Sequence, residues 1–422
     1  MKKIISLLFL CSTIIFSQIN FEEYFTNETL RLDFYHTGNN DNEIISFEKL
    51  VKEQFWAGSK KNLIDTFNYG NYMLKVYDEA ENKLIYSRGF STLFQEWQTT
   101  EEAKNLWRSF EGSVIIPFPK KNIKVEILRR NKKNIFEKKF EYVINPENYF
   151  IIKEKLKPYK NFKVHYSGEP TKKLDIVFIP EGYTESEMGK FKNDCKRFAD
   201  YLFEYSPFSE NKDKINIWGV EAPSAQSGTD IPGKEIWIST LLNSRFYTFD
   251  SERYLMTADY FSVRDVAANA PYDQIFILVN TSKYGGGGIY NFYNITASDN
   301  ERSKQIFIHE FGHGLAGLGD EYGDDNTYQE FYPLDVEPWE PNLTTLINFE
   351  SKWKDLIEPD VPIPTPNDKK YKNKIGVFEG GGYVSKGVYR PSINSIMNSF
   401  SSNEFNEVCK RVLQNIINFY SE

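Results

Sequence analysis

The sequence contains few residues of the kinds that cross-link a chain or bind metals. Its 422 residues include four histidines, five methionines and three cysteines. Two of the cysteines, Cys195 and Cys409, lie far from the start of the chain. Two are too few for a disulfide scaffold, although they could pair in an oxidising compartment or remain as buried free thiols. Stability must therefore come from packing, and the 40% hydrophobic content is ample for two cores.

The chain also lacks an excess of positive charge. With 51 basic and 59 acidic residues, its formal net charge is −8, and no basic stripe stands out. This balance argues against a nucleic-acid partner. Removal of the first 17 residues would make the chain more acidic still, because they include two lysines and no acidic residue.

A single apolar run near the start of the chain indicates targeting. Two lysines precede an almost uninterrupted apolar run over residues 4–16, which Ser17 follows. This pattern predicts a signal peptide over residues 1–17, and hence a bacterial protein that is secreted, periplasmic or held at the cell surface. The run is too short for a membrane span, so no transmembrane segment is expected after cleavage. Cys11 raises the alternative of a lipoprotein, but the bulky residue before it disfavours lipidation.

Two of the scarce histidines, His309 and His313, are four residues apart. On an α-helix this spacing puts both imidazoles on one face, where they can reach a single metal ion. Glu310 follows the first histidine, so its carboxylate can reach a metal-bound water without being a ligand itself. Apolar residues after a Ser-x-x-Glu capping box at Ser298 predict a helix over about residues 299–315. The pattern indicates a hydrolytic zinc site, and the alternative is a partly buried histidine pair without a metal.

A catalytic zinc site usually has three protein ligands and one open position, so a third ligand is needed. Four glycines lie within or just after the predicted helix. Each disfavours the helix by about 1 kcal/mol relative to alanine, and we expect the helix to end near Gly317. A chain that turns there can bring Asp320 back to face His313. Asp320 is therefore the predicted third ligand, Glu321 is the alternative, and an ordinary solvated acidic turn is the interpretation without function.

The segment resembles the metzincin signature, in which a helix carrying HExxH ends at a glycine turn and presents a third ligand. Here Gly317 and Asp320 each lie one residue later than in that signature, which gives HExxHxxxGxxD. Met397, between serine and asparagine neighbours, matches the Met-turn that metzincins place beneath the metal, or it fills an ordinary core gap. Some metzincins also use a tyrosine after the Met-turn as a transition-state stabiliser. Tyr389 or Tyr383 could take that role in this chain.

Several longer segments resemble the immunoglobulin A peptidase family of secreted bacterial metallopeptidases. In the second half of the chain they are Asp175–Tyr183, Ala222–Gly228, His309–Tyr322, Glu337–Thr344 and Tyr389–Ser392. In the first half, Phe90–Ala103 is similar to the N-terminal domain of that family. The resemblance implies that the two histidines and Asp320 bind zinc and that Glu310 is the catalytic base. Glu181 departs from the family pattern, in which we expect aspartate.

The chain divides into two predicted domains. Short segments of alternating apolar and polar residues over residues 18–150 are typical of an antiparallel β-sandwich, which we expect to be an accessory domain. From about residue 158, strand-like and helix-like segments alternate, so residues 158–422 are expected to form a metzincin-like α/β zinc-peptidase domain. In the first domain, Trp56, Trp97 and Trp107 could form a face that binds a sugar or a partner, or they could belong to the core.

Other segments support less specific predictions. The glycine run Gly285–Gly288 could be a sheet edge where an extended peptide adds as a strand, or a flexible loop without a ligand. Residues 328–373 lack periodicity and are expected to form a long ordered loop over the cleft. His36 and His165 stand alone in the sequence and are expected to be structural.

The sequence therefore predicts a secreted zinc metalloendopeptidase that hydrolyses protein or peptide substrates. The family resemblance implies immunoglobulin-like proteins or host and dietary glycoproteins as possible substrates. One alternative is a secreted surface-binding or adhesion protein with a structural metal. The acid at Glu310 argues against it, because structural zinc sites are usually closed by four protein ligands. The other alternative is a zinc amidase that acts on peptidoglycan, which would use the same site chemistry. A shared zinc motif fixes the reaction, whereas surrounding loops set the substrate.

Overall fold

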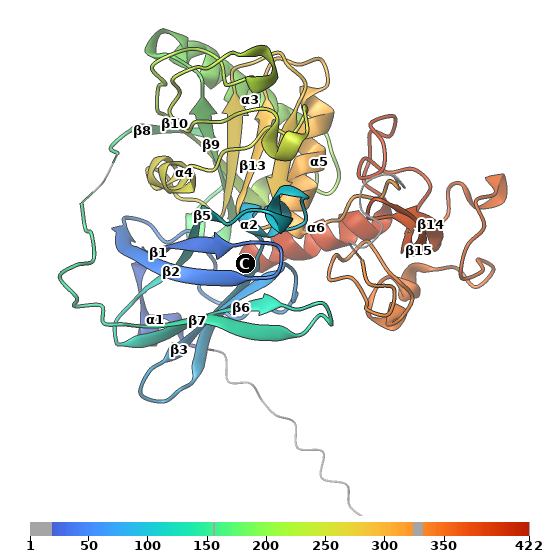
Figure 1. Cartoon of the computed structure of the whole chain (residues 1–422), viewed down its shortest axis with the longest axis horizontal. Coiled ribbons are helices and arrows are strands. Elements are labelled where there is room, and N and C mark those ends of the chain that lie inside the picture. Colours follow the sequence, from blue (N-terminus) through green and yellow to red (C-terminus); the bar gives the residue numbers. More distant parts are fainter. Residues whose placement is uncertain (1–18, 155–156, 324–331, 422) are drawn as a thin grey trace, which may run out of the picture.

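The computed structural model describes residues 19–154, 157–323 and 332–421 (Figure 1). The predicted signal peptide lies outside these ranges and stays a prediction. Among the described helices, none has the length and apolar character that crossing a membrane requires.

The N-terminal domain, residues 19–150, consists of two antiparallel sheets with strand orders β2-β1-β5 and β4-β3-β6-β7. Their side chains meet in one shared hydrophobic cluster, which confirms the prediction of an antiparallel domain. The strands are β1 (Phe25–Gly38), β2 (Glu43–Glu53), β3 (Tyr72–Asp78), β4 (Leu84–Phe90), β5 (Arg108–Pro119), β6 (Ile123–Arg130) and β7 (Phe136–Ile144). Two short helices accompany them, α1 (Phe21–Tyr24) and α2 (Leu93–Trp97).

The following domain is built on a six-stranded sheet of order β12-β13-β11-β9-β10-β8. The four central strands are parallel and the two edge strands, β8 and β12, are antiparallel to their neighbours. The strands are β8 (Lys160–His165), β9 (Leu174–Glu181), β10 (Ile215–Glu221), β11 (Gln274–Val279), β12 (Gly286–Ile289) and β13 (Tyr293–Ala297). Strands β9 and β11 are buried along their whole lengths, as expected for parallel strands with both faces covered.

Helices cover both faces of this sheet (Figure 1). They are α3 (Met188–Leu202), α4 (Tyr260–Ala267), α5 (Ser303–Ala316) and α6 (Glu407–Tyr420). Alternate residues of β9 show the two layers: Phe178 packs with α3, α5 and α6, whereas Ile179 packs on the other face with α4. A hairpin of β14 (Phe378–Gly381) and β15 (Val384–Arg390) follows the sheet in the chain. Short 3-10 turns occupy Glu102–Lys104, Pro170–Lys172, Glu185–Glu187, Lys212–Lys214, Pro232–Lys234, Thr248–Asp250, Phe349–Ser351, Lys354–Leu356 and Lys369–Tyr371.

The two domains share a hydrophobic core. Phe94 and Trp97 of α2 belong to the same buried cluster as Phe246 and Val263 of the following domain. Figure 1 shows α2 between the N-terminal strands and the second sheet. A buried ion pair adds to this contact, because Arg31 of β1 lies 2.7 Å from a carboxylate oxygen of Asp265. The N-terminal domain is therefore packed as part of one body with the second sheet.

The three tryptophans of the N-terminal domain do not form one binding face. Trp56 and Trp97 are core residues of two different clusters, whereas Trp107 is 55% exposed. His36 is a core residue too, and its burial lowers its pKa to about 4 although Glu43 opposes this shift. His165 contacts the carbonyl of Lys212 through Nε2 at 2.9 Å. Neither His36 nor His165 contacts the HExxH helix, in agreement with the prediction that both are structural.

The structure also tests the predictions for the two cysteines and for the long loop. Cys195 of α3 and Cys409 of α6 are buried free thiols, so the disulfide alternative is wrong. The described part of the predicted loop, residues 332–373, is anchored in its own small core. Trp353 is buried there, and its indole N–H donates to the carbonyl of Gly376 at 2.8 Å.

We expect Trp97→Ala to reduce the free energy of unfolding of the whole protein by about 3–5 kcal/mol, as is usual when a buried large aromatic is truncated. Trp107→Ala is the matched control, and its exposed ring predicts a change within about 0.5 kcal/mol. Urea unfolding followed by circular dichroism measures both. A Trp97→Ala protein whose second domain unfolds at the wild-type urea concentration would contradict the shared core.

Candidate active site

Helix α5 carries both histidines and ends as the glycines predict. Gly317 has a φ of 60°, the left-handed conformation that closes a helix C-terminus. The backbone N–H of Leu318 then returns to the carbonyl of Gly312 at 3.2 Å. A Cβ at Gly317 would lie 2.7 Å from the ring of Trp339, so packing and backbone both require glycine there.

The start of α5 differs from the prediction. The helix begins at Ser303 instead of near residue 299, and Ser298 does not cap it. Ser298 is buried, and its N–H donates to the carbonyl of Val279 at 2.8 Å, so the chain still follows the sheet at this point. The Ser-x-x-Glu spacing was therefore misleading, because sheet hydrogen bonding competes with local capping.

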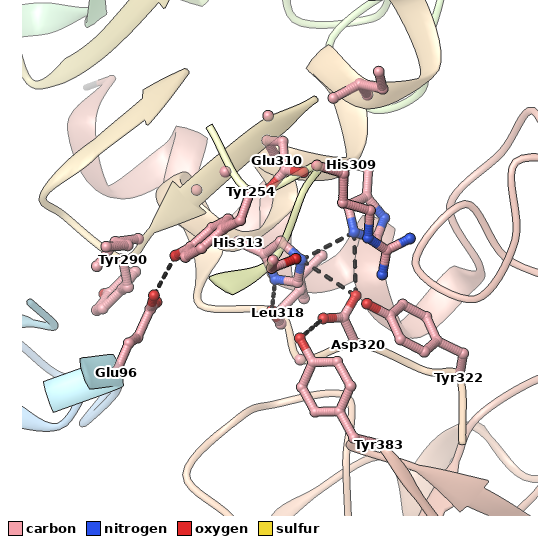
Figure 2. A pocket seen from close by; sticks show the side chains of 18 of the residues that line it. Glu96, Tyr254, Tyr290, His309, Glu310, His313, Leu318, Asp320, Tyr322 and Tyr383 are labelled. Carbon is pink, nitrogen blue, oxygen red and sulfur yellow. Dashed lines mark hydrogen bonds and ion pairs between the residues drawn. The ribbon is translucent and has the colours of Figure 1, made fainter. Parts of the chain in front are cut away.

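The turn after α5 brings Asp320 back to the two imidazoles (Figure 2). Asp320 Oδ1 lies 3.1 Å from His309 Nε2 and 3.4 Å from His313 Nε2. The two Nε2 atoms are themselves 3.1 Å apart. The structure therefore brings together the three residues that the sequence nominated as metal ligands.

Backbone carbonyls fix the orientation of both imidazoles. His309 Nδ1 lies 3.0 Å from the carbonyl oxygen of Ile396, and His313 Nδ1 lies 2.5 Å from that of Leu318. A carbonyl can only accept, so each Nδ1 carries the donated proton. The Nε2 lone pairs are thereby directed at one another and at Asp320. This is the arrangement by which proteins orient metal-binding histidines.

The three converging atoms fit a metal ion of the size of zinc. Four ligands placed tetrahedrally at ~2.0–2.1 Å from zinc are about 3.3 Å apart, which matches the separations found here. Asp320 Oδ1 is buried and faces both Nε2 atoms. Three lone-pair atoms this close repel one another unless a cation lies between them. The donor set of two imidazoles and a carboxylate is also one that zinc takes in catalytic sites.

Electrostatics at the site also favour a positive charge. Burial lowers the pKa of His313, but the charge of Asp320 and its hydrogen bond outweigh this and raise the pKa to about 9. Burial raises the pKa of Asp320, but the two imidazoles outweigh it and hold that pKa well below its ordinary value. The ligand cluster therefore stabilises a cation among its atoms.

Glu310 lies beside the ligand cluster and has no strong partner. Its carboxylate and the ring nitrogens of His309 and His313 all lie within 4.8 Å of one another. Burial raises the pKa of Glu310, although the two histidines oppose this. Glu310 is close enough to be considered as a third ligand, but Asp320 is the better one because it lies within 3.4 Å of both Nε2 atoms. Among the described residues, none donates a hydrogen bond to the Glu310 carboxylate or forms an ion pair with it, so it is available to a substrate or water.

Glu321, the alternative ligand, lies in a different environment. Its buried carboxylate accepts hydrogen bonds from the side-chain amides of Asn342 at 3.0 Å and Asn406 at 2.8 Å, and from the thiol of Cys409 at 3.3 Å. Its backbone N–H donates to the carbonyl of Met397 at 2.9 Å. Glu321 therefore ties the ligand turn to α6 and to the Met397 segment.

The two candidate tyrosines lie in different places. Tyr383, in the β14–β15 turn, donates its hydroxyl to Oδ2 of Asp320, and the N–H of Gly382 donates to the carbonyl of Asp320 at 2.8 Å (Figure 2). Tyr389 pairs with Glu379 in the hairpin and exchanges backbone hydrogen bonds with Thr344. It is not among the described residues that line the cleft. Only Tyr383 is thus placed to act on the site, and it contacts a ligand.

Met397, the predicted Met-turn residue, lies against the middle of α5. It is fully buried, and a Cβ added to Gly312 would come 2.9 Å from its sulfur. The residue before it, Ile396, supplies the carbonyl that orients His309. The Met397 segment therefore supports the helix turn between the two histidines, and Gly312 of that turn permits the close contact.

The glycine run forms strand β12 and is not a flexible loop. It pairs with β13 at the sheet edge and lies directly against α5. A Cβ at Gly288 would be 2.3 Å from the carbonyl oxygen of Glu310, and one at Gly286 would be 2.6 Å from Ile306. Glycine is therefore required at Gly286 and Gly288, because β12 and α5 approach so closely.

Glu181, where the family resemblance led us to expect aspartate, holds a neighbouring loop by hydrogen bonds. Its buried carboxylate, at the end of β9, accepts hydrogen bonds from the hydroxyl of Thr240 and from the backbone N–H groups of Leu242 and Ser244, all between 2.6 and 2.9 Å. It orients the loop that leads to Arg245, whose N–H and carbonyl pair with Met256 beside the cleft.

The ligand cluster lies in a cleft of about 1220 Å³ that both domains line. Sequence reasoning missed two of its residues, Glu96 of α2 and Tyr254, which are joined by a hydrogen bond from the tyrosine hydroxyl (Figure 2). They are separated by 158 residues, so no local pattern reveals the pair. The only signal was the family resemblance of Phe90–Ala103, which includes Glu96.

Comparison with known proteins agrees with the two-part fold. A family model described as IgA Peptidase M64 matches residues 162–374 and 367–417. A second model, described as Peptidase M64 N-terminus, matches residues 20–141. A search of curated proteins found no match. The two family matches extend over most of the chain, and this protein therefore belongs to the IgA peptidase family M64 and is a peptidase.

Proposed function

We propose that this protein is a zinc-dependent endopeptidase in which Glu310 is the general base. The observation that carries the proposal is the convergence of His309 Nε2, His313 Nε2 and Asp320 Oδ1 within 3.4 Å of one another. They lie in an open cleft, beside a carboxylate without a strong partner. A structural metal would need no such acid, and structural zinc sites are closed by a fourth protein ligand.

The residues of the chain divide the chemistry between them. His309, His313 and Asp320 would hold zinc, which when bound lowers the pKa of water toward ~7 and polarises a carbonyl. Glu310 accepts a proton from the attacking water and then donates it to the nitrogen of the leaving amine.

The cleft supports a peptide chain as the substrate. Strand β12 lies at the sheet edge beside α5, so an extended peptide can pair with it and pass across Glu310. Part of this edge is occupied, since the N–H of Leu255 lies 3.4 Å from the carbonyl of Gly286. We infer that substrate pairing uses Gly287 and Gly288. Secretion through the predicted leader at residues 1–17 remains part of this proposal.

Glu310→Gln should lower kcat/KM for peptide hydrolysis by about 10²–10⁴-fold, because a neutral amide cannot accept the proton. Bound zinc, measured by atomic emission, should be unchanged, since the residue is not a ligand. Glu301→Gln, an exposed acid just before the same helix, is the control and should keep wild-type activity. Full activity of the Glu310 variant would exclude this role.

Asp320→Ala and Glu321→Ala should have opposite effects. Loss of a ligand should leave Asp320→Ala folded but without stoichiometric zinc after dialysis. Glu321→Ala should keep its zinc and lose about 2–4 kcal/mol of stability, because two buried amides lose their acceptor. Zinc content and urea unfolding of both proteins test this. The reverse pattern would make Glu321 the ligand.

Tyr383→Phe distinguishes a positioning role from transition-state stabilisation. If the hydroxyl acts by orienting Asp320, zinc affinity should fall about 10–100-fold and excess zinc should restore kcat. If it stabilises the oxyanion, zinc affinity should stay normal and kcat should fall about 10²–10³-fold. The contact with Asp320 leads us to expect the first result. Zinc titrations with a fluorescent chelator, alongside kcat at saturating zinc, separate the two.

A further inference from the structure

The N-terminal domain places one acidic side chain in the cleft. Glu96 lies on α2 and lines the same cleft as the ligand cluster, and its carboxylate points toward Tyr254 (Figure 2). Its Oε2 atom accepts the hydrogen bond from the Tyr254 hydroxyl. The charges of His313, Glu310 and Asp320 all act on its pKa, which shows that it shares the cleft with the site residues.

The position of Glu96 is fixed by its helix. Thr92 caps α2 by accepting a hydrogen bond from the N–H of Gln95 at 3.3 Å, and Phe94 and Trp97 on either side of Glu96 are buried in the shared core. The side chain of Gln95 is itself held by Asn71 at 2.9 Å. Glu96 is therefore presented to the cleft by a rigid support, unlike a glutamate on a flexible surface loop.

No lysine or arginine of the described residues pairs with Glu96, although the charge of His313 acts on it. It forms no ion pair within the described ranges, and its Oε1 atom has no hydrogen-bond partner there. Arg253 precedes Tyr254 in the chain, but its guanidinium interacts with Tyr322, Tyr284 and Asp320 instead. Burial lowers the pKa of Arg253, and these three groups outweigh burial and raise it. A partly buried carboxylate without a counter-charge is costly, and binding a cation relieves that cost. Burial also raises the pKa of Glu96 to about 7, in keeping with this lack of a partner.

We propose that Glu96 is a specificity-determining residue that binds a positively charged side chain, lysine or arginine, of the peptide substrate near the scissile bond. This inference rests on the proposed peptidase site. Tyr254 holds one carboxylate oxygen in place and leaves the other for the substrate cation. The N-terminal domain thereby takes a direct part in substrate selection.

The test uses the zinc-loaded full chain and a peptide library, with new termini identified by mass spectrometry. Wild type should cleave mainly at sites with lysine or arginine at one fixed position. Glu96→Gln removes the charge but keeps an oxygen that accepts from Tyr254, so the fold should persist. It should lower kcat/KM for a basic peptide by about 10–100-fold, as expected for loss of a charged hydrogen bond, and change that for the neutral analogue by less than about 3-fold.

Two further variants sharpen the result. Glu96→Lys should shift the preference at the same position toward aspartate and glutamate. Glu101→Gln, an exposed acid of the same domain that pairs with Lys104 at 2.7 Å, should keep the wild-type profile. Cleavage without a basic preference, or an unchanged preference in Glu96→Gln, would overturn the role of Glu96 and leave the peptidase proposal intact. No cleavage by the zinc-loaded wild type would overturn the proposed function and this inference with it.

Discussion

The need for a cation between three converging lone-pair atoms governs the architecture of this site. His309, His313 and Asp320 approach one another more closely than uncompensated acceptors tolerate. The surrounding contacts hold them in that arrangement. The carbonyls of Ile396 and Leu318 orient the rings, and the β14–β15 turn and the Glu321 hydrogen bonds hold the chain around the aspartate. Pre-organisation of this kind supplies affinity for a metal before any metal arrives.

The sequence predicts those parts of the site that depend on local backbone chemistry. The spacing of the histidines and the glycine at residue 317 determine which face carries the imidazoles and where the helix ends, and both were predictable. The start of α5 was predicted wrongly, because Ser298 is held by the sheet and not by the helix. The choice between Asp320 and Glu321 could not be derived from spacing alone. It depends on Asn342, Asn406 and Cys409, which are distant in sequence and surround only the second acid.

Contacts between the domains were beyond the reach of sequence patterns. The alternation of apolar residues predicted an antiparallel N-terminal domain, but it carried no information on what α2 would face. In the structure α2 belongs to the core beneath the second sheet and to the wall of the cleft. The N-terminal domain therefore contributes both to the shared core and to the wall of the cleft, so it is more than an accessory module. Sequence patterns did not explain the glycine run either, because the lack of side chains at Gly286 and Gly288 follows from the proximity of α5.

The hydrogen bonds of Glu321 also set the order in which the site can be completed. The chain is synthesised from its N-terminus, so the HExxH helix emerges well before its supports. The ligand turn gains Tyr383, the Met397 segment and the partners on α6 only when the last tenth of the chain has left the ribosome. Until then the Glu321 carboxylate lacks its hydrogen-bond donors Asn406 and Cys409, and Asp320 lacks the hydroxyl of Tyr383. A growing chain therefore carries its HExxH helix without the C-terminal supports of the ligand turn during almost all of its synthesis.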